Sequence, residues 1–395
     1  MTTMNAPSDA PWPSLTAARP GRLLSLDFLR GLTIAFMILV NNNGDEVRAY
    51  WPLKHAAWNG FTPTDLVFPT FLFLVGISTV FSTASRLAQG ATRQSLFLHV
   101  VRRSIILFLL GLVVNSFPFF HLSTMRFYGV LPRIAICYLI VASLYLISPG
   151  WRGKAAFAVA ALVAYWILMC FVPVPGYGVP GHDIPLLDRD ANLTAWLDRH
   201  IFTASHLYER TRDPEGLLST IPALATALLG LLTGIWLRTQ RTLVQKTGGI
   251  ATAGLTSILL GGLWNFTFPI NKKLWTSSYV LFAGGLSLLL LALSLTIVDL
   301  PERNAGKQDR SRLLKPFFIF GTNAIAAYVF SELLAAAIAS IHLNSGLNLQ
   351  QYFYQSILRA VPNIAFASLL YSLLFVVVCW LFVAVLYRRR IFLKI

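Results

Sequence analysis

The sequence predicts an all-α, polytopic integral membrane protein with about ten transmembrane helices and both termini in the cytoplasm. Three observations predict this fold class: the composition, a series of long apolar segments, and the distribution of basic residues. The chain of 395 residues is 56% hydrophobic and only 12% charged, whereas a soluble domain carries about 25% charged residues. A chain this apolar is expected in a lipid bilayer rather than as a set of soluble domains.

The apolar segments are long enough to cross a membrane. A transmembrane helix needs about 20 mostly apolar residues, and turn-forming stretches such as SPGWRGK and KTGG separate the segments that qualify. Ten segments meet this requirement: 26–43, 65–85, 97–117, 127–147, 155–173, 217–237, 249–269, 275–298, 316–342 and 366–387. We treat residues 23–395 as one transmembrane domain. Residues 1–22 are polar and Pro-rich without the apolar core of a signal peptide, so we expect a disordered cytoplasmic tail there.

Basic residues concentrate on one side of the predicted membrane. With the N-terminus in the cytoplasm, the cytoplasmic segments hold twenty basic and four acidic residues, and the outer loops hold ten basic and nine acidic residues. Cytoplasmic loops of membrane proteins carry such an excess of Lys and Arg. The bias therefore predicts the orientation and explains the net charge of +16, so nucleic acid is not an expected partner. The three cysteines show neither a disulfide pattern nor the spacing of metal ligands, and no metal is expected.

Two loops on the predicted outer side are rich in polar residues. Residues 44–64 connect the first two spans, and residues 174–216 form the longest loop. A loop of that length is usually functional or disordered. Trp196, Tyr208 and scattered apolar residues favour a loop that folds onto the membrane domain.

The ionisable side chains within predicted spans include Asp27, Arg30, Arg133 and Glu332, and an ionisable group there indicates function by default. Asp27 and Arg30 are three residues apart on one helix face and can pair with each other. Arg133 fits either a structural pairing with a buried group or a contact to a ligand. Asn323, Tyr328 and Glu332 recur at helical spacing, which is typical of a lined cavity and equally of a hydrogen-bonded seam between helices.

The segment PLKHAAWNGFTPTDL places a histidine and an aspartate directly before the second span. His55 titrates near neutrality and can move a proton between a nucleophile and a leaving group, although a satisfied interfacial histidine fits the same pattern. Asp65 can orient that imidazole or simply cap the helix in TPTD. Asn41, at the outer end of the first span, can donate to a developing oxyanion or belong to an interfacial turn.

These residues alone admit two classes of membrane protein, a transporter and a membrane-embedded transferase. A secondary transporter of a small sugar or cation typically has inverted repeats and helices broken at the midplane. Neither feature is evident in the sequence.

Six motifs, in order, cover roughly residues 22–335 and together resemble the heparan-α-glucosaminide N-acetyltransferase family. They are RLLSLDFLRGLTIAFMILVNN, LKHAAWNGFTPTDLVFPTFLFLVG, YGVLPRIAICYL, RDPEGLLSTIPALATALLGLLTG, FPINKKLWTSSYVL and PFFIFGTNAIAAYV. The resemblance implies a transmembrane enzyme that moves the acetyl group of cytosolic acetyl-CoA to a glucosamine amine at the other face. It also implies His55 as the catalytic histidine and Asn41 as its assistant.

The sequence departs from the animal enzyme of this family. From this comparison we expect neither the large lumenal N-terminal domain nor the extra first helix, and the sequence has a few more residues between Asn41 and His55. We therefore expect a bacterial relative in the inner membrane that acts on glucosamine or a small glucosaminide. The expectation of a possible homodimer comes from the resemblance alone. An O-acyltransferase of envelope glycans is the alternative within the same architecture.

The predicted ligand contacts fall at the two faces of the membrane. Phosphates favour clusters of arginine, so acetyl-CoA, the expected co-substrate, is assigned to Arg30, Arg102, Arg103 and Arg133. The amino-sugar acceptor is assigned to outward residues: Trp58, Asn59, Asp213, Glu215, Asn271 and Lys272. A loop-stabilising role is the alternative for Asp213, Glu215, Asn271 and Lys272.

Overall fold

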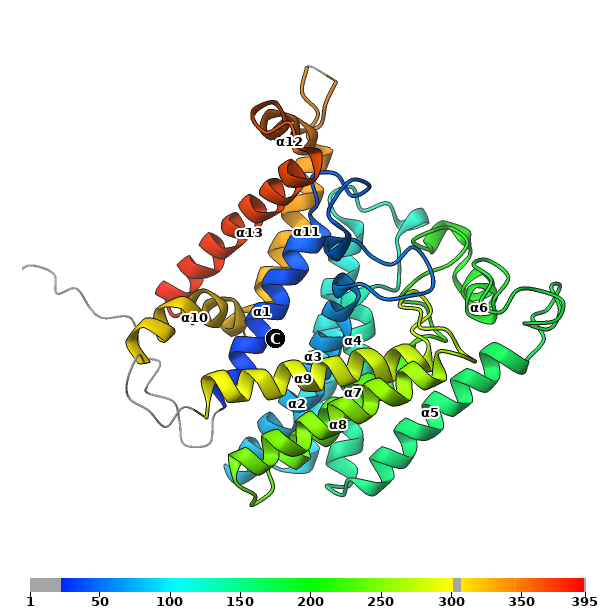
Figure 1. Cartoon of the computed structure of the whole chain (residues 1–395), viewed down its shortest axis with the longest axis vertical. Helices are drawn as coiled ribbons and strands as arrows, with labels where there is room; N and C mark the ends of the chain where they lie inside the picture. The colour runs from blue at the N-terminus through cyan, green and yellow to red at the C-terminus, as the bar shows by residue number, and fades with distance from the viewer. Residues whose placement is uncertain (1–22, 301–306, 345, 394–395) are drawn as a thin grey trace, which may run out of the picture.

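The computed structural model describes residues 23–300, 307–344 and 346–393, so the predicted tail at 1–22 lies outside the described residues. Within these residues the chain forms thirteen α-helices and four short 3-10 helices (Figure 1), and β-structure is limited to isolated bridges. The α-helices are α1 (Leu24–Asn41), α2 (Val67–Ala88), α3 (Arg93–Ser116), α4 (Val130–Ile147), α5 (Arg152–Phe171), α6 (Leu193–Phe202), α7 (Thr220–Leu237), α8 (Leu243–Trp264), α9 (Ser277–Val298), α10 (Lys307–Thr322), α11 (Ala324–Ser340), α12 (Leu349–Ala360) and α13 (Ile364–Arg388). The predicted all-α class is confirmed.

Nine helices of the described chain are long and apolar enough to cross a membrane: α1, α2, α3, α4, α5, α7, α8, α9 and α13. They coincide with nine of the ten predicted spans. The chain is a multi-pass membrane protein.

The remaining predicted span, residues 316–342, is not one continuous helix. It consists of the end of α10 followed by α11, and the two are bent by 84° at the break between them. Asn323 occupies the break, where its side-chain amide donates to the carbonyl of Ile391 at 3.1 Å and accepts from the N–H of Leu393 at 3.0 Å. The two parts together remain apolar enough for a tenth span. Hydropathy alone does not predict the bend, because its polar partner lies about seventy residues away.

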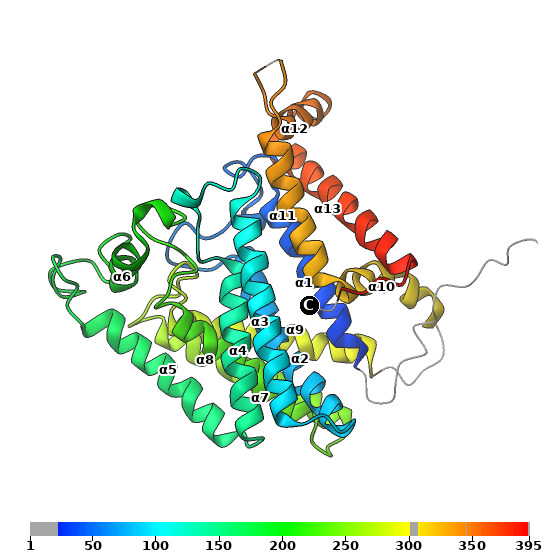
Figure 2. The ribbon, with the colours of Figure 1, turned by 180° about the vertical axis from the view of Figure 1, so that it is seen from behind.

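The loops gather at two ends of the helical bundle (Figures 1 and 2). One end, which we call the His55 end, holds α6, α12 and the loops at 42–62, 117–129, 172–192, 203–219 and 265–276. The opposite end, which we call the basic end, holds the turns at 89–92, 148–151 and 238–242. In both views the C-terminal segment lies beside α1 and α10.

Helix α2 lies at the centre of the bundle and packs against α1, α4, α7 and α9. Its contact with α7 brings backbone against backbone, because glycines face the neighbouring helix. A Cβ atom on Gly76 would lie 2.0 Å from the carbonyl oxygen of Ala227, and one on Gly230 would lie 1.9 Å from that of Phe73. Small residues allow such close helix packing in membranes. The approach fixes the position of α2 relative to α7.

The long loop between α5 and α7 folds back onto the His55 end, as its apolar residues predict. Leu187 and Leu193 join a buried cluster with Tyr165 and Met169 of α5. The hydroxyl of Tyr165 donates to the carbonyl of Leu274 at 2.6 Å, which ties α5 to the loop before α9. The loop therefore forms part of the wall around His55.

Candidate functional site

His55 and Asp65 form a hydrogen-bonded pair at the His55 end, just before α2. His55 Nδ1 lies 2.7 Å from Asp65 Oδ1, and the side chains are 38% and 1% exposed, respectively. The second carboxylate oxygen of Asp65 accepts hydrogen bonds from the N–H groups of Ala56 and Thr62 and from the Thr62 hydroxyl. The carboxylate is thus held from both sides, while part of the imidazole remains accessible.

The local sequence explains why Asp65 is placed so well. Residues Pro63–Leu66 form a 3-10 helix that leads into α2, and Pro63 at its first position is compatible with the required φ angle. Thr62 and Asp65 form a capping box, in which each side chain bonds to the backbone of the other. Asp65 therefore both caps the helix and contacts His55. The two roles considered for this aspartate, helix cap and histidine partner, are present together.

The electrostatic surroundings keep His55 neutral near pH 7. Burial lowers the pKa of His55 from its usual 6.5, and the positive charge of Lys272 lowers it further. The hydrogen bond to Asp65 and the charges of Asp65 and Glu215 raise this pKa without reversing the net shift. Because the Asp65 carboxylate can only accept, the neutral ring donates from Nδ1 and leaves a lone pair on Nε2. That nitrogen can accept a proton or attack an acyl group.

A buried ion cluster borders the same end of the bundle. Arg126 donates from Nε to Asp213 at 2.7 Å and from Nη2 to Glu215 at 2.6 Å, and both carboxylates are buried. Burial alone would raise the pKa of Glu215, but the charges of Arg126, Lys272 and Arg133 hold it below its usual range. The prediction that Asp213 and Glu215 contact the sugar is not supported, because Arg126 already pairs with both carboxylates.

Three other predicted sugar ligands hold loops together, namely Trp58, Asn59 and Asn271. Asn271 is fully buried; its amide donates to Asn59 at 3.0 Å and its oxygen accepts from the N–H of Leu274. Trp58 donates from Nε1 to the carbonyl of Leu187 at 2.8 Å. These contacts join the loop before α2 to the loop before α9 and to the long loop. The side chain of Asn271 is therefore engaged in loop contacts, whereas Lys272 is half-buried and its charge acts on His55.

Asn41 ends α1 at the His55 end and is brought to Glu332 of α11. Its Nδ2 donates to Glu332 Oε1 at 3.3 Å. One hydrogen of this amide is thereby engaged, and the second remains for another acceptor. Asn323 does not continue the Tyr328–Glu332 face of α11, because it lies in the break described above.

Arg133 also lies toward the His55 end, in the first turns of α4. It is fully buried, stacks 5.2 Å from the Trp275 ring, and donates from Nη2 to the Gly216 carbonyl at 3.0 Å and to the Ser219 hydroxyl. The structure surrounds Arg133 with these buried groups and does not place it in the lining of the cavity described below. The structural pairing is what the geometry supports.

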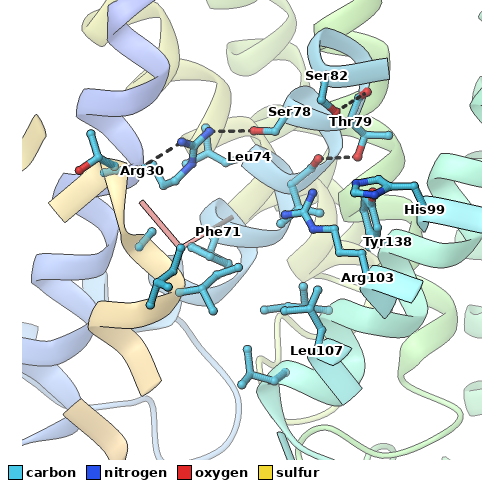
Figure 3. Close-up of a pocket in the computed structure, with 18 of the residues that line it drawn as sticks. Arg30, Phe71, Leu74, Ser78, Thr79, Ser82, His99, Arg103, Leu107 and Tyr138 are labelled. Carbon is cyan, nitrogen blue, oxygen red and sulfur yellow. Dashed lines mark hydrogen bonds between the residues drawn. The ribbon is translucent and has the colours of Figure 1, made fainter. Parts of the chain in front are cut away.

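A cavity of about 290 Å³ opens among α1, α2, α3, α4 and the α10–α11 break (Figure 3). Its charged and titratable lining includes Arg30, Arg86, His99 and Arg103, and no described carboxylate lines it. Arg103 stacks 4.7 Å from the ring of Tyr138. A lining of this kind suits an anionic ligand.

Two of the arginines assigned to acetyl-CoA line this cavity and two do not. Arg30 is paired with Asp27 at 3.0 Å. It also donates to Ser78 at 2.9 Å, and Arg103 of α3 lines the same cavity (Figure 3). Arg102 is exposed and, like Arg133, is absent from the lining. Neither Arg86 nor His99 was singled out from the sequence, although both line the cavity. Spacing could have found His99, since it lies one helical turn before Arg103.

The cavity extends along α2 toward the histidine. Phe71 and Arg86 both line it, and fifteen residues of α-helix span about 22 Å. Phe71 lies only six residues after Asp65. The same helix therefore connects the arginines of the basic end with the His55–Asp65 pair.

Comparison with known sequences decides the family. Residues 22–261 match the family model described as heparan-alpha-glucosaminide N-acetyltransferase, catalytic, which is more than half of the chain. The protein belongs to this family. It is 30% identical to heparan-alpha-glucosaminide N-acetyltransferase of Homo sapiens across 96% of the chain, and 31% identical to the Mus musculus protein across 82%. The chain spans 61% and 55% of the lengths of these two relatives.

The region matched by the heparan-alpha-glucosaminide N-acetyltransferase family model contains both parts of the site. It includes the His55–Asp65 pair and the cavity lining from Arg30 to Tyr138. The lining contributed by residues 321–325 and by Leu393 lies beyond the match.

Proposed function

We propose that this membrane protein transfers the acetyl group of acetyl-CoA to the amine of glucosamine or a small glucosaminide. The names of its relatives supply the reaction and the class of acceptor. The observation that carries the proposal is that one helix, α2, begins at the His55–Asp65 pair and lines the basic cavity toward its other end.

Acetyl-CoA enters from the basic end in this proposal. The excess of Lys and Arg in the segments at that end supports assigning it to the cytoplasm, where acetyl-CoA is available. Arg86, His99 and Arg103 provide positive charge and N–H donors for the phosphates. The narrow pantetheine arm then follows α2 between the helices and delivers the thioester to the His55 end.

His55 acts as a base in the direct form of the transfer. The acceptor nitrogen attacks the thioester carbonyl carbon, and its proton passes to His55 Nε2 as the C–N bond forms. The C–S bond then breaks, and the imidazolium returns the proton to the departing thiolate, so that the products are the amide and CoA. Asp65 stabilises the imidazolium and holds its orientation. The free hydrogen on Asn41 Nδ2 is available to the developing oxyanion.

A second route uses the same atoms in two steps. His55 Nε2 attacks the thioester and carries the acetyl group, and the acceptor amine then takes it. A burst of CoA release in the absence of acceptor, equal to the amount of enzyme, distinguishes the two-step route from direct transfer.

The break between α10 and α11 does not favour a transporter. Broken helices in transporters leave backbone groups free to bind the solute. Here the Asn323 side chain in the break bonds to the backbone of the chain's own C-terminal segment.

The test is CoA release from acetyl-CoA by the purified protein in detergent, with glucosamine or N-acetylglucosamine as acceptor. Release that requires glucosamine and is absent with N-acetylglucosamine supports N-acetyl transfer. Equal release with both sugars contradicts it and points to an O-linked acceptor. Absence of acetyl-CoA binding contradicts both forms of acyl transfer.

A further inference from the structure

Glu332 of α11 is a half-buried carboxylate without a cationic partner among the described residues. Its one hydrogen bond there is the one that Asn41 donates to Oε1 at 3.3 Å. A carboxylate inside a membrane protein is unfavourable unless it is paired, hydrogen-bonded or used in function. One neutral amide on one oxygen leaves Oε2 without a described donor.

The other described acids at this end differ from Glu332. Asp213 and Glu215 pair with Arg126, and Glu209 pairs with Arg212 and Lys273. Asp65, Asp183 and Asp190 have a histidine or arginine partner, whereas Asp45, Glu46 and Asp188 lie in loops outside the helical bundle. Asp198 is buried next to the N–H of Leu217, and burial raises its pKa to about 7. Glu332 is thus the acid of a described membrane helix at this end that lacks a counter-charge.

The contact with Asn41, the last residue of α1, brings Glu332 to the His55 end. Tyr328 precedes Glu332 by one helical turn, and the charges of Glu332 and Glu215 both act on it. The charge of Glu215 in turn acts on His55. Asn41 is exposed, so the Asn41–Glu332 contact is open to a ligand rather than sealed in the core. Helix α11 packs directly on α1, which positions the two side chains.

We propose that Glu332 binds the protonated amine of the acceptor and thereby makes the site selective for amino sugars over sugars that carry only hydroxyl groups. The inference rests on the proposed function and names the acceptor subsite within it. The ammonium donates to Glu332 Oε2, while Asn41 holds Oε1 in place. The ammonium releases one proton to solvent before transfer, and the neutral amine is then the nucleophile. An amide or hydroxyl at this position gains no ion pair and binds more weakly.

The experiment compares wild type with Glu332→Gln, which keeps Oε1 as an acceptor for Asn41 and removes the charge. The control is Glu46→Gln, which removes an exposed charge from a loop at the same end. Two quantities are measured for each protein: the Kd for glucosamine by calorimetry and the KM for glucosamine in CoA release. Hydroxylamine, which is uncharged at neutral pH, serves as a second acceptor.

We expect Glu332→Gln to raise the glucosamine Kd and KM by about ten- to a hundredfold, the range for a lost charged hydrogen bond. The KM for hydroxylamine and the Kd for acetyl-CoA stay within about twofold, and Glu46→Gln resembles wild type. Equal losses with glucosamine and hydroxylamine, or no change in either, overturn the assignment. Glucosamine binding that depends on Glu332 in a protein that transfers no acetyl group supports the subsite and refutes the proposed function. Wild type that binds no glucosamine refutes the subsite.

Discussion

Replacing Asp65 by asparagine tests whether Asp65 sets the tautomer of the His55 imidazole. Three donors face Asp65 Oδ2, namely the N–H groups of Ala56 and Thr62 and the Thr62 hydroxyl. An asparagine has one oxygen, and these donors require it at that position. The amide NH2 then faces His55 Nδ1, which must accept instead of donate. The imidazole proton moves to Nε2, and the lone pair needed for proton transfer is lost.

The magnitude follows from the interaction that is removed. A hydrogen bond to a charged group contributes about 1.5–3 kcal/mol, and each 1.4 kcal/mol of transition-state stabilisation is about tenfold in rate. We expect kcat for glucosamine acetylation to fall by about 10- to 100-fold or more in Asp65→Asn, with the Kd for acetyl-CoA unchanged. The assay is steady-state CoA release across pH.

The pH profile supplies a second readout with a defined sign. His55 acts as a base, so activity falls as the pH drops through its pKa, which lies below 6.5. Asp65 raises the pKa of His55, and removing that charge moves the acidic limb of the profile to lower pH. Asp183→Asn is the matched control, because Asp183 also lies 2.7 Å from a histidine Nδ1 but in an exposed pair. Unchanged kcat in Asp65→Asn, an acidic limb that moves to higher pH, or an equal effect in Asp183→Asn would refute the reasoning.

Three further predictions concern the cavity and the fold. Arg103→Gln should raise the KM for acetyl-CoA about tenfold, because a charged contact is lost. Arg102→Gln, at the adjacent exposed position, should leave this KM unchanged. Equal effects of the two substitutions argue against the cavity as the acetyl-CoA site. Gly76→Ala should lower the Tm in detergent, because the added methyl group forces α2 and α7 apart and costs about 1–3 kcal/mol or more of folding free energy. Gly262→Ala is the control and should leave the Tm unchanged, because nothing lies within 4 Å of its Cβ position. A Tm for Gly76→Ala equal to that of wild type contradicts the close packing of the two helices. Arg126→Gln leaves two buried carboxylates unpaired, which costs about 3–5 kcal/mol of stability. The Tm should fall more at neutral pH than near pH 4, where protonation neutralises the carboxylates. A loss of Tm that does not depend on pH contradicts the ion cluster.

The sequence predicts most of the fold and the part of the site formed by residues close together in the chain, the His55–Asp65 pair. Nine spans follow from apolar length, because a bilayer imposes length and hydropathy on every crossing helix. The His55–Asp65 contact could be anticipated because both residues lie within a segment of eleven that ends in a helix start. Local capping chemistry therefore encodes this part of the site.

The rest depends on contacts between distant segments. The break at Asn323 is stabilised by residues 391 and 393, and a window of hydropathy cannot include that partner. Arg102 and Arg103 are neighbours in sequence and similar in chemistry, yet only Arg103 faces the cavity. Packing against neighbouring helices decides which face of a helix lines the cavity. Arg133 shows the same limit, because its partners Gly216 and Ser219 come from a loop more than eighty residues away.

The most direct test of the account is glucosamine-dependent CoA release by His55→Ala, measured beside its Kd for acetyl-CoA. The account predicts that acetyl-CoA binds with the wild-type Kd, because the cavity at the basic end is intact, while release falls to the uncatalysed rate. Turnover at the wild-type rate in a folded, acetyl-CoA-binding His55→Ala protein would contradict the claim that this histidine carries the reaction.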